Sequence, residues 1–493
     1  MTTTDGSLVL IGPTDEACAE HAERARLAVN GAPPQAVVGG LIAPAFTPLT
    51  DLLQPEPHTV IAIRTDLGLV STHELTCCAP AAAPPDTTIE PNALRSANDL
   101  ATLGTLRSFV DHRYGPVSGL FRTGHLPLAT VTAELDHHLA GYGRTSTFDQ
   151  AERVAIFEAI ERRNGLRPRR AGVEASCTEL GDRALDPRRL GLCDFEQRYT
   201  PDLRFRWTEA WSYSAGKPVL IPEQVAYYGA ETLPEQRFLY ETSNGCGLGN
   251  SLTEAVLHGL FEVAERDAFL LAWYSGSPLK RIKIPDDPLL HHLTDRLEER
   301  GYELLFLDAT TDLGIPAVIS LARTDDDLPR AFFAAGASPD PLQALRSAAV
   351  EVAVDVESFA DRVRAHPADH SEDRLRRLLD DPALVRTMND HVAVNTLPEA
   401  AARHAFLVGD ETTELADERD HTSLEELLDR YAGELEIIAV DQTDPVTANR
   451  LGLYSAKVLV PGTLPMTFGH LQRRTHGLPR LAELRNPHPH PFP

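Results

Sequence analysis

Residues 241–273 read "ETSNGCGLGNSLTEAVLHGLFEVAERDAFLLAW" and place Glu254, Glu262 and Glu265 in a run that is otherwise mostly apolar. Each residue of a helix advances about 100° around the axis, so these three carboxylates fall on one narrow stripe. The remaining sides are largely apolar, which predicts a buried helix. Buried carboxylates on one stripe repel one another, and each is costly to desolvate. They must be protonated, paired with Arg or Lys, or bound to a cation.

A second acidic pair favours the cation. The segment "TFDQAERVAIFEAIERRNG", residues 147–165, places Glu158 and Glu161 one turn apart on one helical face. Both segments carry the pattern Glu-x-x-Glu-Arg, so two matched acidic helices can face each other across a site. Mg²⁺ prefers oxygen ligands and keeps positions for water and phosphate. The alternative is a pair of helices with ordinary Glu–Arg surface ion pairs, because this pattern is common on helices.

Composition restricts the class of protein. The chain has 493 residues and a formal net charge of −26, which argues against a nucleic-acid or anionic-membrane partner. The N-terminus has no basic region followed by an apolar one, and no apolar run approaches the roughly 20 residues that span a bilayer. We therefore expect a soluble, cytoplasmic protein.

Cysteine and histidine spacing predicts no further metal site. The six cysteines form no Cys-x-x-Cys motif and are expected to be reduced, buried thiols. The 19 histidines form no His-Glu-x-x-His motif and no other compact ligand set. His488 and His490, near the C-terminus, are as well explained by exposed positions.

Hydrophobic patterning predicts a mixed α/β fold with two parts. Residues 1–76 form a small α/β domain, with strands expected at 8–11, 36–43 and 59–68 and a helix after the first strand. Residues 77–91 are rich in Ala and Pro and form a linker. Residues 92–493 form the main domain, with strands expected at 304–308, 317–322, 330–335 and 436–440. The charged segment 397–432 has a helical pattern.

The segment "SNGCGLGNSLTEAVLHGLFEVAERDA" resembles the central motif of the YcaO family. The matching residues are Ser243, Asn244, Gly245, Gly249, Asn250, Glu254, Glu262, Glu265 and Arg266. Residues 143–163 resemble the first nucleotide motif of the family, with Arg144, Glu158, Glu161 and Arg162 in place, and residues 336–359 resemble the third, with Glu351 at its glutamate. The resemblance covers residues 105–493 and implies a YcaO-like domain.

The resemblance implies a site for ATP and Mg²⁺ made of carboxylate-bearing helices. The implied metal ligands are Glu158, Glu161, Glu254, Glu262 and Glu265. The implied ATP-binding residues are Arg144, Ser243, Asn250, Arg266 and Glu351. In azoline-forming members, a Cys, Ser or Thr side chain of a precursor peptide attacks the preceding carbonyl, the resulting oxygen is phosphorylated, and phosphate leaves. The implied enzyme is therefore a YcaO-type peptide cyclodehydratase of thiazole/oxazole-modified peptide biosynthesis.

The C-terminal sequence "NPHPHPFP" resembles the proline-rich end of azoline-forming YcaO proteins. Pro489, Pro491 and Pro493 fix φ and favour a stiff, extended tail. Such a tail can aim the carboxylate of Pro493 into the active site as a general base. Without the resemblance, a disordered tail would be the default interpretation.

The family also implies partners. These are the ribosomal precursor peptide, an E1-like leader-peptide-binding protein, in some systems an FMN-dependent azoline dehydrogenase, and a second copy of the chain in a homodimer. Two positions depart from the family pattern, because Val154 and Val354 stand where Ser and Gln are usual. Valine cannot hydrogen-bond a nucleotide. A catalytically weakened scaffold that presents the peptide, or an enzyme that forms thioamides or amidines, therefore remain alternatives.

Overall fold

The computed structural model describes residues 2–5, 8–13, 56, 58–64, 67–75, 94–125, 128–135, 139–168, 172–196, 198–326, 329–417, 421 and 423–492. Within these ranges the strands form four sheets. No helix within them is long and apolar enough to cross a membrane. The mixed α/β fold predicted from the sequence is confirmed.

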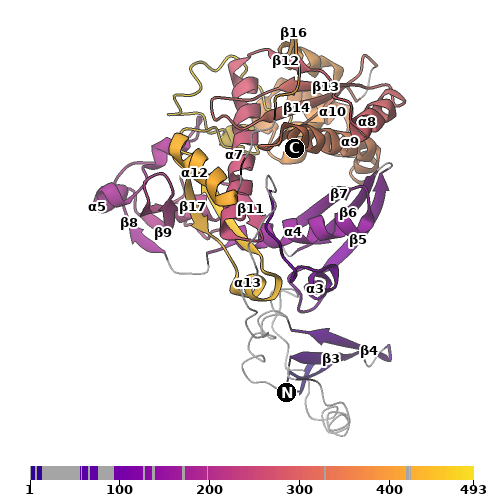
Figure 1. Cartoon of the computed structure of the whole chain (residues 1–493), viewed down its shortest axis with the longest axis vertical. Helices are drawn as coiled ribbons and strands as arrows, with labels where there is room; N and C mark the ends of the chain where they lie inside the picture. Colours follow the sequence, from indigo (N-terminus) through magenta and orange to yellow (C-terminus); the bar gives the residue numbers. More distant parts are fainter. Residues whose placement is uncertain are drawn as a thin grey trace.

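The N-terminal part contains an antiparallel sheet at one end of the molecule (Figure 1). Its strands, in spatial order, are β1 (Thr2–Asp5), β2 (Leu8–Ile11), β3 (Thr59–Arg64) and β4 (Leu69–Glu74). The strands predicted at 8–11 and 59–68 are formed, the second ending at Arg64. The helix and the strand predicted between them lie outside the described residues. The boundaries at 76/77 and 91/92 fall there too, so the division into domains stays a prediction.

Three strand–helix pairs carry the acidic segments. The elements are β7 (Ala140–Thr145) with α4 (Phe148–Leu166), β11 (Cys246–Gly249) with α7 (Leu252–Ser275), and β15 (Ala331–Ala337) with α9 (Pro341–Ala365). Glycines let each helix lie directly on its strand: a Cβ at Gly143 would meet the carbonyl oxygen of Ala151 at 1.8 Å, and one at Gly247 would meet that of Ala255 at 2.2 Å. The close packing fixes where each helix presents its polar side chains.

Helix α7 lies near the centre of the part of the chain that is described from residue 94 onward (Figure 1). The Ser251 hydroxyl accepts a hydrogen bond from the backbone of Glu254 at its N-terminus, and Gly276, with φ of +64°, ends it. The helix lies between two sheets, because it packs on β11 and β18 of one and on β14 and β15 of the other. The first sheet contains β8 (Val173–Ala175), β9 (Phe205–Ser212), β10 (Lys217–Pro222), β11, β17 (Ile438–Asp441) and β18 (Tyr454–Leu459).

The second sheet is covered on both faces. It contains β12 (Leu279–Ile282), β13 (Glu303–Asp308), β14 (Ala317–Arg323), β15 and β16 (Val408–Thr413). Along β14, Ile319 and Leu321 pack in the cluster of α7, whereas Val318 and Ala322 pack in that of α9 and α8 (Pro288–Glu298). Alternate residues are therefore buried on opposite faces, which explains the continuous apolar pattern of these strands. The strands predicted at 304–308, 317–322 and 330–335 are confirmed.

The remaining elements surround this core. A smaller antiparallel sheet orders β5 (Gly119–His125), β6 (Leu128–Glu134) and β7. The other helices are α3 (Leu103–Arg107), α5 (Cys177–Leu180), α6 (Glu223–Ala226), α10 (Glu372–Asp380), α11 (Met388–Val394), α12 (Leu424–Glu434) and α13 (Pro445–Leu451).

The helical pattern predicted for 397–432 is wrong in its middle: Pro398–Arg403 and Ala405–Leu407 form short 3₁₀ helices, but the chain then changes to a strand. Residues 408–413 form strand β16, which pairs with β12 in parallel, and α12 begins only at Leu424. The sequence "VGDETT" is charged, but its valine and threonines suit an edge strand, and pairing with β12 decides its conformation.

Candidate active site

Helices α4 and α7 bring carboxylates from two distant segments together. Glu161 of α4 lies close enough to Glu262 of α7 for their charges to repel, and Glu265 of α7 is similarly close to Glu262 and to Glu351 of α9. Three helices that are separate in sequence therefore contribute to one group of acidic side chains. We call Glu158, Glu161, Glu262, Glu265 and Glu351 the carboxylate cluster.

The electrostatics of the carboxylate cluster disfavour ionisation without a cation. Burial raises the pKa of Glu161 well above its ordinary value, and the charges of Glu262 and Glu158 raise it further. Burial raises the pKa of Glu265 to about 8, with a further contribution from Glu351. The pKa values of Glu262 and Glu351 are also raised, chiefly by burial. A cation among these oxygens would reverse the effect.

Three arginines offset part of the negative charge. Arg266 of α7 lies 3.4 Å from Glu262 and 3.6 Å from Glu265. Arg144 of β7 lies 3.3 Å from Glu351. Arg162 of α4 pairs with Glu158 at 2.6 Å, and the backbone N–H of Tyr142 donates to the other oxygen of Glu158. With every group ionised, five carboxylates and three guanidinium groups leave two excess negative charges.

Both interpretations of the repeated Glu-x-x-Glu-Arg pattern are visible here. The pairs Glu158–Arg162 and Glu262–Arg266 are intrahelical contacts four residues apart, as an ordinary ion pair would be. Glu158 of α4 is satisfied by Arg162 and by the backbone N–H of Tyr142. For Glu161 and Glu265, burial and the neighbouring carboxylates outweigh the nearby arginines and raise the pKa values.

Several buried side-chain atoms in and beside the carboxylate cluster have no hydrogen-bond partner in the described part of the chain, and their chemistry fits a bound cation and an anionic group. Among the described residues, Glu262 Oε2 and Arg266 Nη1 are buried and have no hydrogen-bond partner, and Arg144 Nε is in the same condition. A free carboxylate oxygen suits a hard cation, and free guanidinium N–H groups suit phosphate. The residues of the carboxylate cluster therefore fit Mg²⁺ and a phosphate-bearing ligand.

Glu254 and Asn250 lie apart from the carboxylate cluster. Eight residues of helix separate Glu254 from Glu262 by about 12 Å along the axis. Glu254 is fully buried, and its Oε2 accepts a hydrogen bond of 2.8 Å from the backbone of Ser96. Asn250 bonds Asn98 at 2.9 Å and the carbonyl of Ser96 at 2.8 Å. Glu254 and Asn250 hold segment 96–98 at the start of α7. The polar face of the helix therefore makes contacts at two separate positions along its length. The predicted roles of Glu254 and Asn250 at metal and nucleotide stay predictions.

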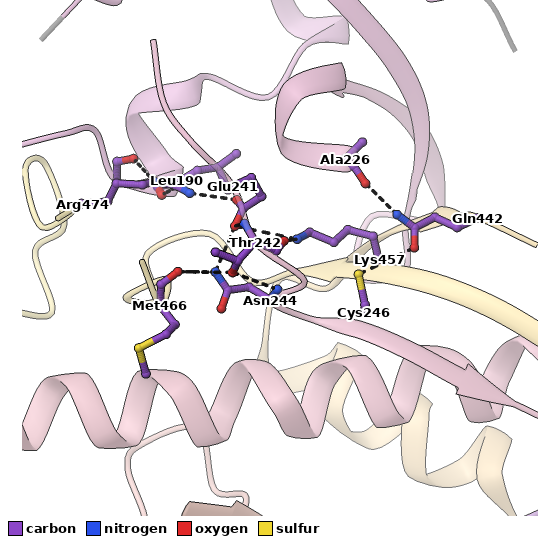
Figure 2. A network of polar contacts seen from close by, with 11 residues as sticks. Leu190, Ala226, Glu241, Thr242, Asn244, Cys246, Gln442, Lys457, Met466 and Arg474 are labelled. Carbon is purple, nitrogen blue, oxygen red and sulfur yellow. Dashed lines mark hydrogen bonds and ion pairs between the residues drawn. The ribbon is translucent and has the colours of Figure 1, made fainter. Parts of the chain in front are cut away.

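A buried ionic network supports the turn at Ser243 (Figure 2). Ser243 contributes its carbonyl to Cys246 N at 2.8 Å, and Gly245 adopts φ of +68°, where a Cβ would meet the carbonyl of Val458 at 2.3 Å. Before this turn, Glu241 bonds Arg474 at 2.8 Å and lies 3.9 Å from Lys457. Burial favours the neutral acid, but Lys457 and Arg474 outweigh burial and hold the pKa of Glu241 below its ordinary value.

The network extends to the residues that follow Glu241. The Asn244 amide donates to Glu241 at 2.9 Å and to the carbonyl of Met466 at 2.6 Å, and the Lys457 ammonium donates to the carbonyl of Thr242 at 3.2 Å. We call Glu241, Lys457 and Arg474 the Glu241 network. A cavity of about 40 Å³ is lined by all three residues of the Glu241 network and by Arg266, which pairs with Glu262 and Glu265.

The analysis of the sequence missed the Glu241 network. One signal was present: Lys457 interrupts the apolar strand "YSAKVL", where a lysine is rarely buried without a partner. Its partner lies 216 residues earlier in the chain, and no local pattern identifies it.

The C-terminal tail is bound along α7, so the predicted exposure of His490 is wrong. Trp273 Nε1 donates to the carbonyl of His488 at 2.9 Å, and Phe492 packs on Phe269 with ring centroids 4.8 Å apart. His490 is fully buried and bonds the carbonyl of Thr467 at 2.9 Å. Its burial is possible because its ring also packs against another neutral histidine, His391, with ring centroids 4.2 Å apart.

The tail reaches the carboxylate cluster. The guanidinium carbon of Arg266 lies 4.3 Å from the ring centroid of Phe492, which is 1 % exposed. Pro489 and Pro491 lie in this bound segment, and Pro493 lies outside the described residues. The tail follows α7 from Trp273 towards its N-terminus and meets the helix beside Glu265.

The two positions that depart from the family pattern have different environments. Val154 is 38 % exposed on α4. Val354 is 5 % exposed and belongs to the hydrophobic cluster of α8, α9 and the second sheet. Val354 is thus a core residue.

Known proteins resemble this chain in sequence. The family model described as YcaO cyclodehydratase, ATP- and Mg²⁺-binding, matches residues 142–464. An uncharacterized protein in the tfuA 3' region of Rhizobium leguminosarum bv. trifolii is 30 % identical over 269 residues, which cover 50 % of this chain and 62 % of the relative. An uncharacterized protein of Methanothermobacter thermautotrophicus is 27 % identical over 244 residues, which cover 48 % of this chain and 62 % of the relative. The chain therefore spans less than two thirds of both curated relatives.

Solved structures share the fold. A heterocyclase in complex with substrate and cofactor matches with a TM-score of 0.70 at 22 % identity, over 100 % of this chain and 77 % of that chain. The heterocyclase TruD matches at 0.63 and 19 % identity, over 95 % of this chain and 71 % of that one. YcaO from Methanopyrus kandleri, bound with AMPPCP and Mg²⁺, matches at 0.53 and 20 % identity, over 73 % of this chain and 89 % of that one.

Proposed function

The chain belongs to the YcaO family, and from that membership and the geometry of the site we propose that it is an ATP- and Mg²⁺-dependent peptide cyclodehydratase. Its substrate would be a ribosomal precursor peptide, in which Cys, Ser or Thr residues become thiazolines or oxazolines. The single observation that carries the proposal is the meeting of the bound tail with the carboxylate cluster, where Phe492 packs on Arg266.

Each residue of the carboxylate cluster has a role in this proposal. Glu161, Glu262 and Glu265 would hold Mg²⁺, because Glu161 lies against other carboxylates while Glu262 and Glu265 share one arginine. Arg144 and Arg266 bind phosphate oxygens through N–H groups that have no partner among the described residues. When bound, ATP supplies the phosphoryl group that turns the amide oxygen into a good leaving group.

The remaining candidates support these groups. Glu158 orients Arg162, and Glu351 orients Arg144. Ser243 and Asn250 lie at either end of the segment that leads into α7, where the Glu241 network and segment 96–98 hold the backbone in place. In this proposal they position the helix, and Pro489, Pro491 and Pro493 shape the tail that faces the peptide.

The proposal includes partners. The carboxylate cluster lies within one chain, but a precursor peptide needs a surface that holds its leader. We expect an E1-like leader-binding protein to supply that surface, and an FMN-dependent dehydrogenase to oxidise azolines where azoles are the product. A homodimer and a cytoplasmic location complete the proposal.

A reconstituted reaction tests this function. The purified chain, a leader-binding partner and a precursor peptide rich in Cys, Ser and Thr are mixed with ATP and Mg²⁺. The proposal expects ADP formation and loss of the mass of one water per ring. A peptide that gains sulfur in place of oxygen would identify a thioamide-forming enzyme instead.

A scaffold function is the second candidate, and Val154 favours it. This side chain is exposed on α4, where the family usually has a hydroxyl that can bond a nucleotide. The same reaction separates the two candidates: binding of the precursor peptide without any ATP turnover would support the scaffold and reject the enzyme. Replacing Val154 with Ser should then increase nucleotide affinity by several-fold.

A further inference from the structure

Two histidines and an aspartate meet where the N-terminal sheet contacts the rest of the chain. His73 lies on β4, and Asp111 and His112 lie in the turn that follows α3. Each residue offers one ligand atom, and the three atoms lie within 4.8 Å of one another. Spacing in the sequence could not reveal this group, because 38 residues separate His73 from Asp111.

The carboxylate of Asp111 is held in position. Its Oδ1 accepts hydrogen bonds from the backbone of Arg113 at 2.8 Å and of Tyr114 at 2.9 Å. Its Oδ2 lies 2.6 Å from His73 Nδ1. The turn itself requires Gly115, since a Cβ there would lie 2.4 Å from the backbone nitrogen of Asp111. One oxygen is therefore occupied by the turn, and the other is directed at the histidine.

The contact of His73 with Ser71 helps to decide what lies between His73 and Asp111. The ring is 2 % exposed, and its Nε2 lies 2.7 Å from the hydroxyl of Ser71. The neutral ring has two tautomers: either Ser71 Oγ–H donates to Nε2 while Nδ1–H donates to Asp111, or Nε2–H donates to Ser71 and the lone pair of Nδ1 faces the carboxylate. In the second tautomer two acceptors face each other at 2.6 Å, and a cation between them removes their repulsion.

His112 supplies a third donor at the edge of this contact. Its ring lies edge-on to that of His73, with centroids 5.3 Å apart. His112 is the exposed member of the three, and its ligand nitrogen lies within 4.8 Å of the ligand atoms of His73 and Asp111. Its exposed side leaves room for water as a fourth ligand.

We propose that His73, Asp111 and His112 bind a Zn²⁺ ion that fastens β4 of the N-terminal sheet to the turn after α3. Two imidazoles, one carboxylate and an open position form a donor set typical of Zn²⁺, and nitrogen ligands disfavour Mg²⁺. Zn²⁺ distances of roughly 2.0–2.2 Å are reached by small shifts of these side chains. The ion would act beside the Arg450–Glu74 ion pair of 2.9 Å, which joins the same strand to α13.

Cobalt titration of the full chain tests this site, because four-coordinate Co²⁺ absorbs visible light far more strongly than six-coordinate Co²⁺. The proposal expects a saturable visible spectrum at one equivalent, displaced by Zn²⁺ and not by millimolar Mg²⁺. His112→Ala should weaken Co²⁺ binding at least tenfold, and it should fold normally because His112 is exposed. His292→Ala, an exposed histidine on α8, is the matched control and should leave binding unchanged.

Two results would overturn the proposal. One is equal Co²⁺ affinity in His112→Ala and His292→Ala. The other is loss of the visible spectrum in the double variant Glu262→Gln/Glu265→Gln, since the signal would then arise from the carboxylate cluster. Retention of the spectrum in that double variant supports a separate site, whatever the variant does to ATP-dependent activity.

Discussion

The Glu241 network and the carboxylate cluster are neighbouring groups of charged side chains that differ in how far cationic partners balance their carboxylates. Glu241 has two cationic partners, and its pKa is held below the ordinary value. Glu262 and Glu265 share one arginine, and their pKa values are raised. The first group is complete as it stands, whereas the second has more carboxylates than the protein neutralises.

Solvent access separates the two groups further. The side chains of Glu241, Lys457 and Arg474 are 2 %, 0 % and 2 % exposed. Those of Glu262, Glu265 and Glu351 are 23 %, 17 % and 33 % exposed. A closed and balanced network stabilises a fold, while an open and unbalanced one can receive a ligand. Substitutions in the two groups should therefore have opposite consequences.

Glu241→Gln should give the largest change in stability. It leaves Lys457 and Arg474 buried without their counter-charge, and breaking such a pair destabilises a protein by about 3–5 kcal/mol. Urea denaturation measures the change. The control is Glu303→Gln, because its ion pair with Arg323 is exposed and should contribute nothing measurable. Equal stability of the two variants would show that the Glu241 network is not a structural support.

Glu265→Gln should instead remove activity and preserve the fold. Loss of a metal ligand is expected to lower ATP turnover at least 100-fold, which corresponds to about 2.7 kcal/mol. The thermal midpoint should stay nearly the same, because a pKa of about 8 leaves Glu265 largely protonated at neutral pH and therefore neutral, as glutamine is. A variant that keeps full turnover, or one that unfolds, would contradict the contrast with Glu241.

Acid should release the tail from α7. His391 Nδ1 donates to the carbonyl of His490 at 2.8 Å and its Nε2 accepts from Gly469 N at 3.0 Å, so the bound ring is neutral. Burial lowers the pKa of His391 to about 4, whereas an unfolded histidine titrates near 6.5. Stability from the neutral ring is therefore complete above pH 6.5 and is lost as pH falls towards 4.

Between pH 7 and pH 5 the loss should be on the order of 2 kcal/mol for this ring. Hydrogen-exchange protection factors of the amides of His488, His490 and Phe492, which correct for the slower chemical exchange in acid, should fall over that interval. In His391→Gln, which cannot gain the proton, the fall should be smaller, and buried His490 remains as a titrating group. Equal pH dependence in both proteins would assign the effect to other groups.

Phe492→Leu should have the smallest effect. The substitution keeps an apolar side chain beside Arg266 and removes the cation–π contact, which contributes about 1 kcal/mol. Turnover should fall by roughly fivefold with unchanged nucleotide affinity. Tyr240→Leu, which removes an exposed contact with Arg237, is the control and should be silent. A fall in nucleotide affinity alone would place Phe492 in ATP binding.

Local pattern predicted the helices and their acidic residues well. The apolar run around Glu262 predicted a buried helix, which the structure shows as α7, and the segment that carries Glu158 and Glu161 forms α4. The resemblance to the YcaO family also indicated Arg144, Arg266 and Glu351, which the structure brings to the carboxylate cluster. Periodicity reports the direction in which a side chain points, so residues on facing helices could be recognised.

Position along a helix and pairing between distant segments could not be predicted in this way. Glu254 lies on the same face of α7 as Glu262 but two turns away, where its carboxylate accepts a hydrogen bond from the backbone of Ser96. The partners of Lys457, the burial of His490 and the meeting of His73 with Asp111 depend on the packing of remote segments. These contacts become visible only when the sheets are assembled.

Binding of a non-hydrolysable ATP analogue, measured by titration calorimetry with and without Mg²⁺, tests the central claim most directly. Mg²⁺-dependent binding to the unmodified chain is expected, with an affinity at least 100-fold lower in Glu262→Gln/Glu265→Gln, although that variant should remain folded. Equal analogue affinity in the two proteins would contradict the assignment of the carboxylate cluster as the Mg²⁺ and nucleotide site.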